Sequence, residues 1–191
     1  MDSGINDAHW VQFFDDAQSR SETVASFLHD GLHQGATLLI VETKEHWQAT
    51  ARLLAGQRVP IEAAAQSGQL TVLDAGDAVA LVGGADEMGS ERFDRSIGAL
   101  VRRLASRARS LRVYGEVVDV LAKRGDLDAA LRLEALWNAL IAQVPMALLC
   151  GYSAPRYREP GRSEEFQRIC SAHSHQRLST GDTIAIQQPA R

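Results

Sequence analysis

The clearest structural signal in the sequence is the stretch Ala36-Thr37-Leu38-Leu39-Ile40-Val41-Glu42-Thr43. A nearly continuous apolar run of this length is typical of a strand that is covered on both faces, as in a parallel sheet. Apolar residues recur with helical spacing on either side of it, over residues 21–34 and 44–54. The stretch therefore predicts an α/β protein built around a central sheet.

The alternation of strands and helices continues outward from this stretch in both directions. We predict further strands at residues 9–14, 70–75, 111–118 and 146–152, and a last strand in the tail at 183–186. We predict further helices at residues 60–68, 91–107, 127–143 and 163–174. The segments 76–90 and 153–162 are rich in glycine or proline, so we predict loops there, the first with at most a short helix. No repeat or linker divides the chain, which predicts a single domain over residues 1–191.

Composition limits the classes of function. The chain has 191 residues, of which 45% are apolar and 23% charged, as expected for one globular domain. It lacks both an apolar run of about 18 residues for a membrane span and the basic, then apolar, start of a secretion signal. The formal net charge of −4 disfavours nucleic acid as a partner. We therefore expect a cytoplasmic protein that binds neither membrane nor nucleic acid.

Several short motifs follow one another in a recognisable order. They are His9-x-x-x-Phe13-Phe14-Asp15, Gly68-Gln69-Leu70, Tyr114-Gly115-Glu116, Glu134-x-x-x-Asn138, Cys150-Gly151-Tyr152 and a late histidine, His173 or His175. Together they resemble the MEDS family, the sensory domain named after the dichloromethane regulator DcmR of methylotrophs. The resemblance covers about residues 9–175 and leaves 176–191 as a C-terminal tail. It implies a RecA/KaiC-like three-layer sandwich with a mostly parallel sheet, in a bacterial signalling protein that senses small organic molecules.

The resemblance also implies a partner. Members of the family are often attached to histidine kinases or DNA-binding domains, and this chain shows no recognisable output domain. We therefore expect a histidine kinase or a transcriptional regulator to act with it in trans. RecA-like relatives assemble into rings, which leaves a homo-oligomer as an open alternative.

The segment after the first strand is where a RecA-like protein carries its phosphate-binding loop. Here it reads Asp15-Asp16-Ala17-Gln18-Ser19-Arg20-Ser21. A working loop needs glycines, so that backbone N–H groups can surround the phosphates, and a lysine for charge. This segment has neither, and its two carboxylates would repel phosphate. We therefore expect a degenerate loop and no enzymatic activity.

Candidate ligand-binding residues come from these motifs, because open α/β sheets bind ligands at the carboxyl ends of their strands. They are Phe13, Phe14, Asp15, Tyr114, Glu116, Glu134, Asn138 and Tyr152. The aromatic residues line an apolar pocket or simply form the core. For Glu116 three roles remain open: it contacts a ligand, it caps the next helix, or it pairs with an arginine. Glu134 and Asn138 share a helix face and contact a ligand or tie down a loop.

The sequence does not predict a metal site or another cofactor. His29 and His33, and Cys170 with His173 and His175, have suggestive spacings, but no set of three or four converging ligands is evident. Cys150 lacks a basic neighbour in the sequence and is expected to behave as a small apolar residue.

Three hypotheses for the function remain open. The first is a module that binds a small organic ligand at the carboxyl edge of the sheet, with segments 76–90 and 152–162 closing over it. The second is a KaiC-like protein that binds or hydrolyses nucleotide with the help of Glu116. The third is an adaptor that binds only proteins.

Overall fold

The computed structural model describes residues 8–83 and 89–177, and within them the prediction of an α/β fold is confirmed. The strands are β1 (His9–Phe14), β2 (Thr37–Glu42), β3 (Leu70–Asp74), β4 (Leu111–Gly115), β5 (Ala147–Ser153) and β6 (His175–Arg177). They form one six-stranded sheet in the order β3-β2-β4-β5-β1-β6, and all neighbouring strands are parallel.

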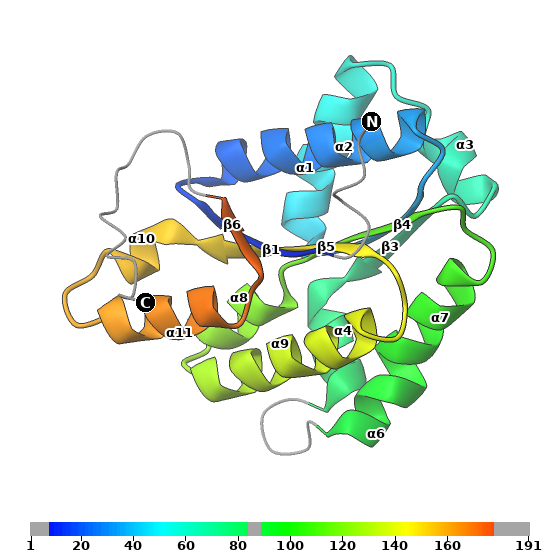
Figure 1. Ribbon diagram of the computed structural model, residues 1–191. Helices are drawn as coiled ribbons and strands as arrows, with labels where there is room; N and C mark the ends of the chain where they lie inside the picture. The colour runs from blue at the N-terminus through cyan, green and yellow to red at the C-terminus, as the bar shows by residue number, and fades with distance from the viewer. Residues whose placement is uncertain (1–7, 84–88, 178–191) are drawn as a thin grey trace.

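Helices cover both faces of the sheet and give three layers (Figure 1). One face carries α1 (Ala17–His33), α2 (Lys44–Gly56) and α3 (Ile61–Gln66). The other carries α4 (Ala75–Val82), α6 (Ser90–Phe93), the π-helical turn η1 (Asp94–Gly98), α7 (Ala99–Ala105), α8 (Val117–Lys123), α9 (Leu127–Ile141) and α11 (Ser163–Ser171). The short helix α10 (Ala154–Tyr157) follows β5 directly.

Alternation along the strands builds two separate cores. Leu38 and Ile40 of β2 face the α1 side, whereas Leu39 and Val41 face the α9 side, and all four side chains are buried. Because a strand turns successive side chains to opposite faces, a run that is apolar throughout can bury both. This explains why the stretch around β2 is such a clear signal.

The predicted loops differ from the structure in places, and the short helix α10 lies within the predicted loop 153–162. The polar loop after β1 is shorter than expected, since α1 begins at Ala17, where the Asp16 side chain accepts a hydrogen bond from the Ser19 N–H (2.7 Å). Segment 76–90 contains α4, which Asp74 caps in the same way through the Asp77 N–H (3.0 Å). Residues 84–88 of that segment lie outside the described residues.

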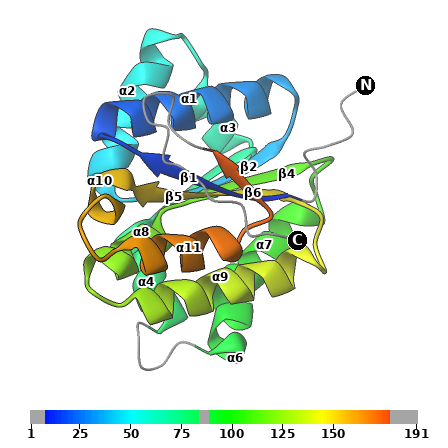
Figure 2. The ribbon, with the colours of Figure 1, turned by 60° about the vertical axis from the view of Figure 1, so that its left-hand side comes forward.

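The C-terminal part also differs from the expectation. Helix α11 ends at Ser171 rather than 174, and residues 175–177 form β6, which pairs with β1 (Figure 2). The ring of His175 stacks on Trp10 with centroids 4.2 Å apart. The predicted strand at 183–186 lies outside the described residues. Among the helices that are described, none has the length and apolar character to cross a bilayer.

Candidate functional site

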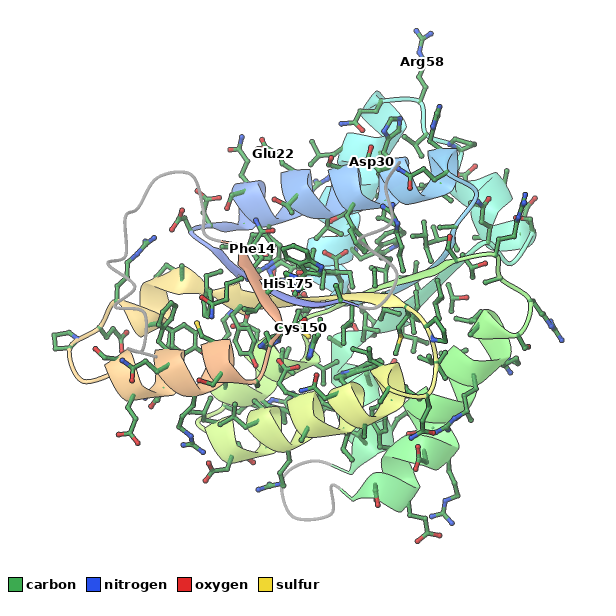
Figure 3. The ribbon with its side chains drawn as sticks, viewed as in Figure 1. Phe14, Glu22, Asp30, Arg58, Cys150 and His175 are labelled. Carbon is green, nitrogen blue, oxygen red and sulfur yellow. The ribbon has the colours of Figure 1, made fainter. Side chains whose placement is uncertain are left out.

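The candidate residues divide between the two faces of the sheet. Phe14 and Tyr114 belong to the core under α1, whereas Phe13 and Tyr152 belong to the core above α9. Figure 3 shows this division for Phe14 and Cys150, which lie on opposite sides of the sheet. These four aromatic residues therefore form parts of two cores and do not line one shared pocket, because neighbours along a strand point in opposite directions.

Phe13 and Tyr152 are part of an aromatic cluster at the end of β1 and β5. Phe13 contacts Tyr152 (centroids 5.7 Å apart), Tyr157 (5.5 Å) and Phe166 (4.7 Å). All are buried or partly buried in the α9-side core. Asp15, which follows β1, forms an ion pair with Arg158, which follows α10. These contacts fix the first β–α joint against α10 and α11.

Glu116 lies at the carboxyl end of β4, as predicted, and is 1% exposed. Its carboxylate accepts hydrogen bonds from the Thr43 N–H (2.5 Å) and from His46 Nδ1 (2.7 Å), and it lies 3.6 Å from Arg20 Nε. Burial raises the pKa of Glu116, but the hydrogen bonds from His46 and Thr43 lower it by more than burial raises it. The pKa of Glu116 is therefore below its usual value. Of the open interpretations, pairing with an arginine is what the structure records.

Arg20 extends this group of charges, which we call the Arg20 network. Its guanidinium is 4% exposed and lies 3.5 Å from Asp119, which also contacts Lys123 (2.8 Å) and accepts a hydrogen bond from the Ser153 N–H (2.9 Å). The same guanidinium stands over the ring of Phe14, 5.5 Å from its centroid. Charges of the protein itself therefore occupy the carboxyl ends of β4 and β5.

Glu42 is the unusual member on the far side of the Arg20 network. It is 1% exposed, and one of its oxygens accepts a hydrogen bond from the Thr50 hydroxyl (3.2 Å). Burial, together with the negative charge of Glu116, raises its pKa to about 8. Glu42 is therefore mostly neutral at pH 7, which keeps the number of buried negative charges small.

The α9 face holds a second polar group, which we call the Glu134 cluster. It contains Glu134, His9, His173, Cys150 and Tyr152, contributed by α9, β1, β5 and the turn after α11. Their side chains are buried.

Short distances join the members of the Glu134 cluster. The Tyr152 hydroxyl donates to Glu134 Oε1 (2.8 Å), and the Cys150 thiol donates to Glu134 Oε2 (3.3 Å). His9 Nε2 lies 3.2 Å from the same Oε2, and His173 Nε2 lies 3.2 Å from Oε1. Burial raises the pKa of Glu134, but the facing histidines lower it more, so the carboxylate is charged at neutral pH.

Asn138 stands beside the Glu134 cluster and ties it to the turn after α11. Its amide nitrogen donates to the carbonyl of Ala172 (2.8 Å), and its Oδ1 faces His9 Nδ1 (2.9 Å). Asn138 therefore has the structural role that the helix-face pairing with Glu134 left open. His9 and His173 occur in the motifs, but nothing in the sequence joined them to Glu134, because strand register and the turn after α11 bring them there.

A small, largely apolar cavity borders Cys150 and the end of β4. Its lining residues are Val41, Ala78, Val82, Ile97, Gly115, Val117, Val118, Leu133, Trp137 and Cys150. The volume of the cavity is about 10 Å³. A Cβ atom built on Gly115 would meet nothing within 4 Å, so the backbone borders open space there. We call this space the Gly115 cavity.

The π-helical turn η1 forms one wall of the Gly115 cavity through Ile97. Single π-helical turns inside helices occur frequently at functional sites. The sequence predicted one uninterrupted helix over 91–107, because the apolar spacing across Phe93, Ile97 and Val101 fits an α-helix nearly as well.

Comparison with known proteins agrees with this fold. The sequence profile described as "MEthanogen/methylotroph, DcmR Sensory domain" (MEDS) matches residues 8–175. Among solved structures, a KaiC-like protein from the hyperthermophilic archaeon Pyrococcus horikoshii OT3 is similar with a TM-score of 0.57 and 18% identity, over 84% of this chain and 69% of that one. No curated protein matches the chain. The predicted resemblance and the predicted KaiC-like fold are both confirmed.

Proposed function

Because this chain belongs to the MEDS family of sensory domains, we propose that it acts in signal transduction by binding a compact, apolar organic molecule in the Gly115 cavity. The observation that carries the proposal is the open space at Gly115. This glycine lies in the apolar wall of the cavity, and a Cβ atom added to it would contact no other atom within 4 Å. This site lies at the carboxyl end of β4, the edge at which open α/β sheets bind ligands.

The chemistry of the lining supports an apolar ligand. Among the lining residues, only Cys150 and Trp137 carry a polar atom in the side chain. A polar ligand would leave its hydrogen bonds unsatisfied there, which costs about 1–3 kcal/mol for each group. An apolar molecule gains about 25 cal/mol for each Å² that it removes from water.

The size of the cavity limits the ligand to a few heavy atoms. A cavity volume of about 10 Å³ is enough for roughly one water molecule. A molecule of three to six heavy atoms enters only if a wall moves slightly. The π-helical turn is the wall that we propose to move.

Ile97 offers a route for the signal to the surface. It lines the Gly115 cavity and also an open groove with Leu73, Leu81, Leu100 and Arg103. Leu81 is 47% exposed in this groove. We propose that ligand shifts η1 between two arrangements, and that a histidine kinase or transcriptional regulator in the cytoplasm recognises the difference in trans.

The start of α1 favours this proposal over a nucleotide hydrolase. Only Asp15 and Asp16 separate β1 from α1, and the Asp16 carboxylate already accepts the Ser19 N–H that would otherwise face a phosphate. We therefore expect no phosphate release from Mg-ATP by the purified protein.

Binding is tested by thermal unfolding and isothermal titration with methanol, dichloromethane, chloroform and benzene. We expect the chlorinated molecules to raise the unfolding midpoint, because a ligand that binds only the folded state stabilises it by about 2.7 kcal/mol at a hundredfold excess over its Kd. Methanol, which is polar, is expected to have no effect at the same concentration.

Two glycine substitutions make the test specific to the site. Gly115→Ala places a methyl group in the cavity, whereas Gly56→Ala places one at the end of α2, where a Cβ also meets nothing within 4 Å. We expect Gly115→Ala to weaken binding at least tenfold and Gly56→Ala to leave it unchanged. Equal affinities of the two variants, or no binding of any probe to the wild type, would refute the proposed site.

A further inference from the structure

The Glu134 cluster combines two imidazoles, a thiol and a carboxylate at a single buried point. His9 is 2% exposed, Glu134 0%, Cys150 1% and His173 8%. One ligand atom from each lies within 4.8 Å of the others. From this geometry we propose that His9 Nε2, Glu134, Cys150 Sγ and His173 Nε2 bind one zinc ion in a closed tetrahedral site.

The spacing of the donor atoms fits zinc. A tetrahedral zinc ion with bonds of about 2.0–2.3 Å holds its ligand atoms about 3.3–3.7 Å apart. His9 Nε2, Cys150 Sγ and Glu134 Oε2 form a triangle with sides of 3.2, 3.3 and 3.3 Å. His173 Nε2 lies 3.2 Å from the other oxygen of Glu134. Three of the four groups therefore already stand at nearly the distances that an ion would impose, and His173 lies within 4.8 Å of the others.

The outer nitrogens of both histidines are held as they are in zinc sites. The Asn138 amide nitrogen donates to Ala172, so its oxygen faces His9 Nδ1, which must donate the proton. His173 Nδ1 donates to the carbonyl of Ile169 (2.7 Å). A metal-bound histidine almost always donates its outer N–H to a carbonyl or carboxylate in this way. In the neutral imidazoles, both Nε2 lone pairs then point into the cluster.

Hydrogen bonds alone do not satisfy the cluster. His173 Nε2 has no hydrogen-bond partner of acceptable geometry, although it is buried against Glu134. Buried polar atoms without partners are uncommon, so each requires an explanation. An ion at the centre would satisfy both nitrogens, the sulfur and an oxygen together.

Charge balance favours the same ion. Zinc binding exchanges the thiol proton of Cys150, which leaves to solvent, for a zinc–sulfur bond. The thiolate and the Glu134 carboxylate then neutralise the two positive charges of zinc, and a fully buried site needs this balance. Nitrogen, sulfur and oxygen donors in one tetrahedral set suit zinc better than calcium or magnesium, which take oxygen.

The proposed ion would have a structural role, since all four positions are filled by the protein. Its ligands come from β1, α9, β5 and the turn that leads into β6. Zinc would thus fasten the edge of the sheet to α9. The site shares Cys150 with the Gly115 cavity but does not depend on a ligand there, so the metal test varies cysteines and the ligand test varies glycines.

The test measures metal content by mass spectrometry on the full chain that has been stripped with chelator, dialysed against Zn²⁺ and freed of excess ion. We expect one zinc per chain in the wild type and in Cys170→Ala, the matched control with the other buried free cysteine. Cys150→Ala is expected to bind zinc at least a hundredfold more weakly. Cobalt(II) in place of zinc should give a thiolate charge-transfer band in the wild type and the control only.

Contrary results are equally well defined. Less than a tenth of a zinc per chain in the wild type, or equal zinc affinity in Cys150→Ala, would overturn the proposal. Iron(II) taken up in preference to zinc from an equimolar mixture would overturn the identity of the ion, because a site of this kind ordinarily binds zinc more tightly than iron(II). Zinc X-ray absorption of the wild type needs no variant to fold. One sulfur with three nitrogen or oxygen neighbours supports the site, and a shell without sulfur refutes it.

Discussion

Replacement of Glu42 by glutamine should change the pH dependence of stability in a calculable way. The carboxyl group is buried beside Glu116, and its pKa rises from 4.5 to about 8. In the unfolded chain it ionises from about pH 4.5, while in the folded chain it keeps its proton until about pH 8. The unfolded state therefore binds fewer protons between these values, and the free energy of unfolding falls as pH rises.

The size of the effect follows from the shift. At 1.36 kcal/mol for each pKa unit, Glu42 costs the folded state about 1 kcal/mol at pH 5 and about 4 kcal/mol at pH 8. Glutamine has nearly the same shape as glutamate and does not titrate, and its side-chain oxygen can still accept a hydrogen bond from the Thr50 hydroxyl. Glu42→Gln should therefore exceed the wild type in stability by an amount that grows by about 3 kcal/mol over this range.

Urea unfolding followed by circular dichroism at pH 5, 6, 7 and 8 measures this difference. The control is Glu45→Gln on the same helix boundary, where the side chain is exposed and the difference from wild type should not change with pH. A stability difference for Glu42→Gln that stays constant from pH 5 to 8 would show that Glu42 ionises normally, and the described burial would be wrong.

Further substitutions test the packing. Gly151→Ala should lower stability by about 1–3 kcal/mol, because its Cβ would lie 2.5 Å from the Tyr114 hydroxyl and 3.0 Å from a ring carbon of Phe14; adding Tyr114→Phe should recover part of this loss in thermal unfolding, and no recovery would place the clash elsewhere. Tyr114→Phe alone should not destabilise, because the hydroxyl is buried without a hydrogen-bond partner. Asp16→Ala should cost about 1 kcal/mol through loss of the cap on α1, whereas a neutral result would mean that the Ser19 N–H does not depend on it.

The sheet was predictable because its strands are buried on both faces. The apolar runs at 36–43 and 146–152 each became a strand, with shifts of a residue or so at the ends. Helix α4 was anticipated only as a short helix within a loop, because Gly76 and Gly83 suggested a loop. Gly76 instead lies in the first turn, and Gly83 ends the helix in the left-handed region at φ 101°.

The site was predictable only where neighbours in sequence carry it. The four-residue spacing of Glu134 and Asn138 placed both on one face of a helix. His9 and His173 could not be joined to them, because they lie 125 positions before and 39 positions after Glu134, and strand register decides their meeting. Arg20 was missed for a different reason. The sequence placed Arg20 in a loop, so no direction could be predicted for its side chain. Because α1 begins at Ala17, Arg20 lies on the helix and its side chain reaches Glu116.

A crystal structure under xenon gas or dichloromethane vapour tests the central claim most directly. Electron density between Gly115 and Trp137 in the wild type, lost in Gly115→Ala crystals treated identically, is the predicted result. Density that appears only in surface grooves, with nothing enclosed by β4, α4, η1 and α9, would contradict the account.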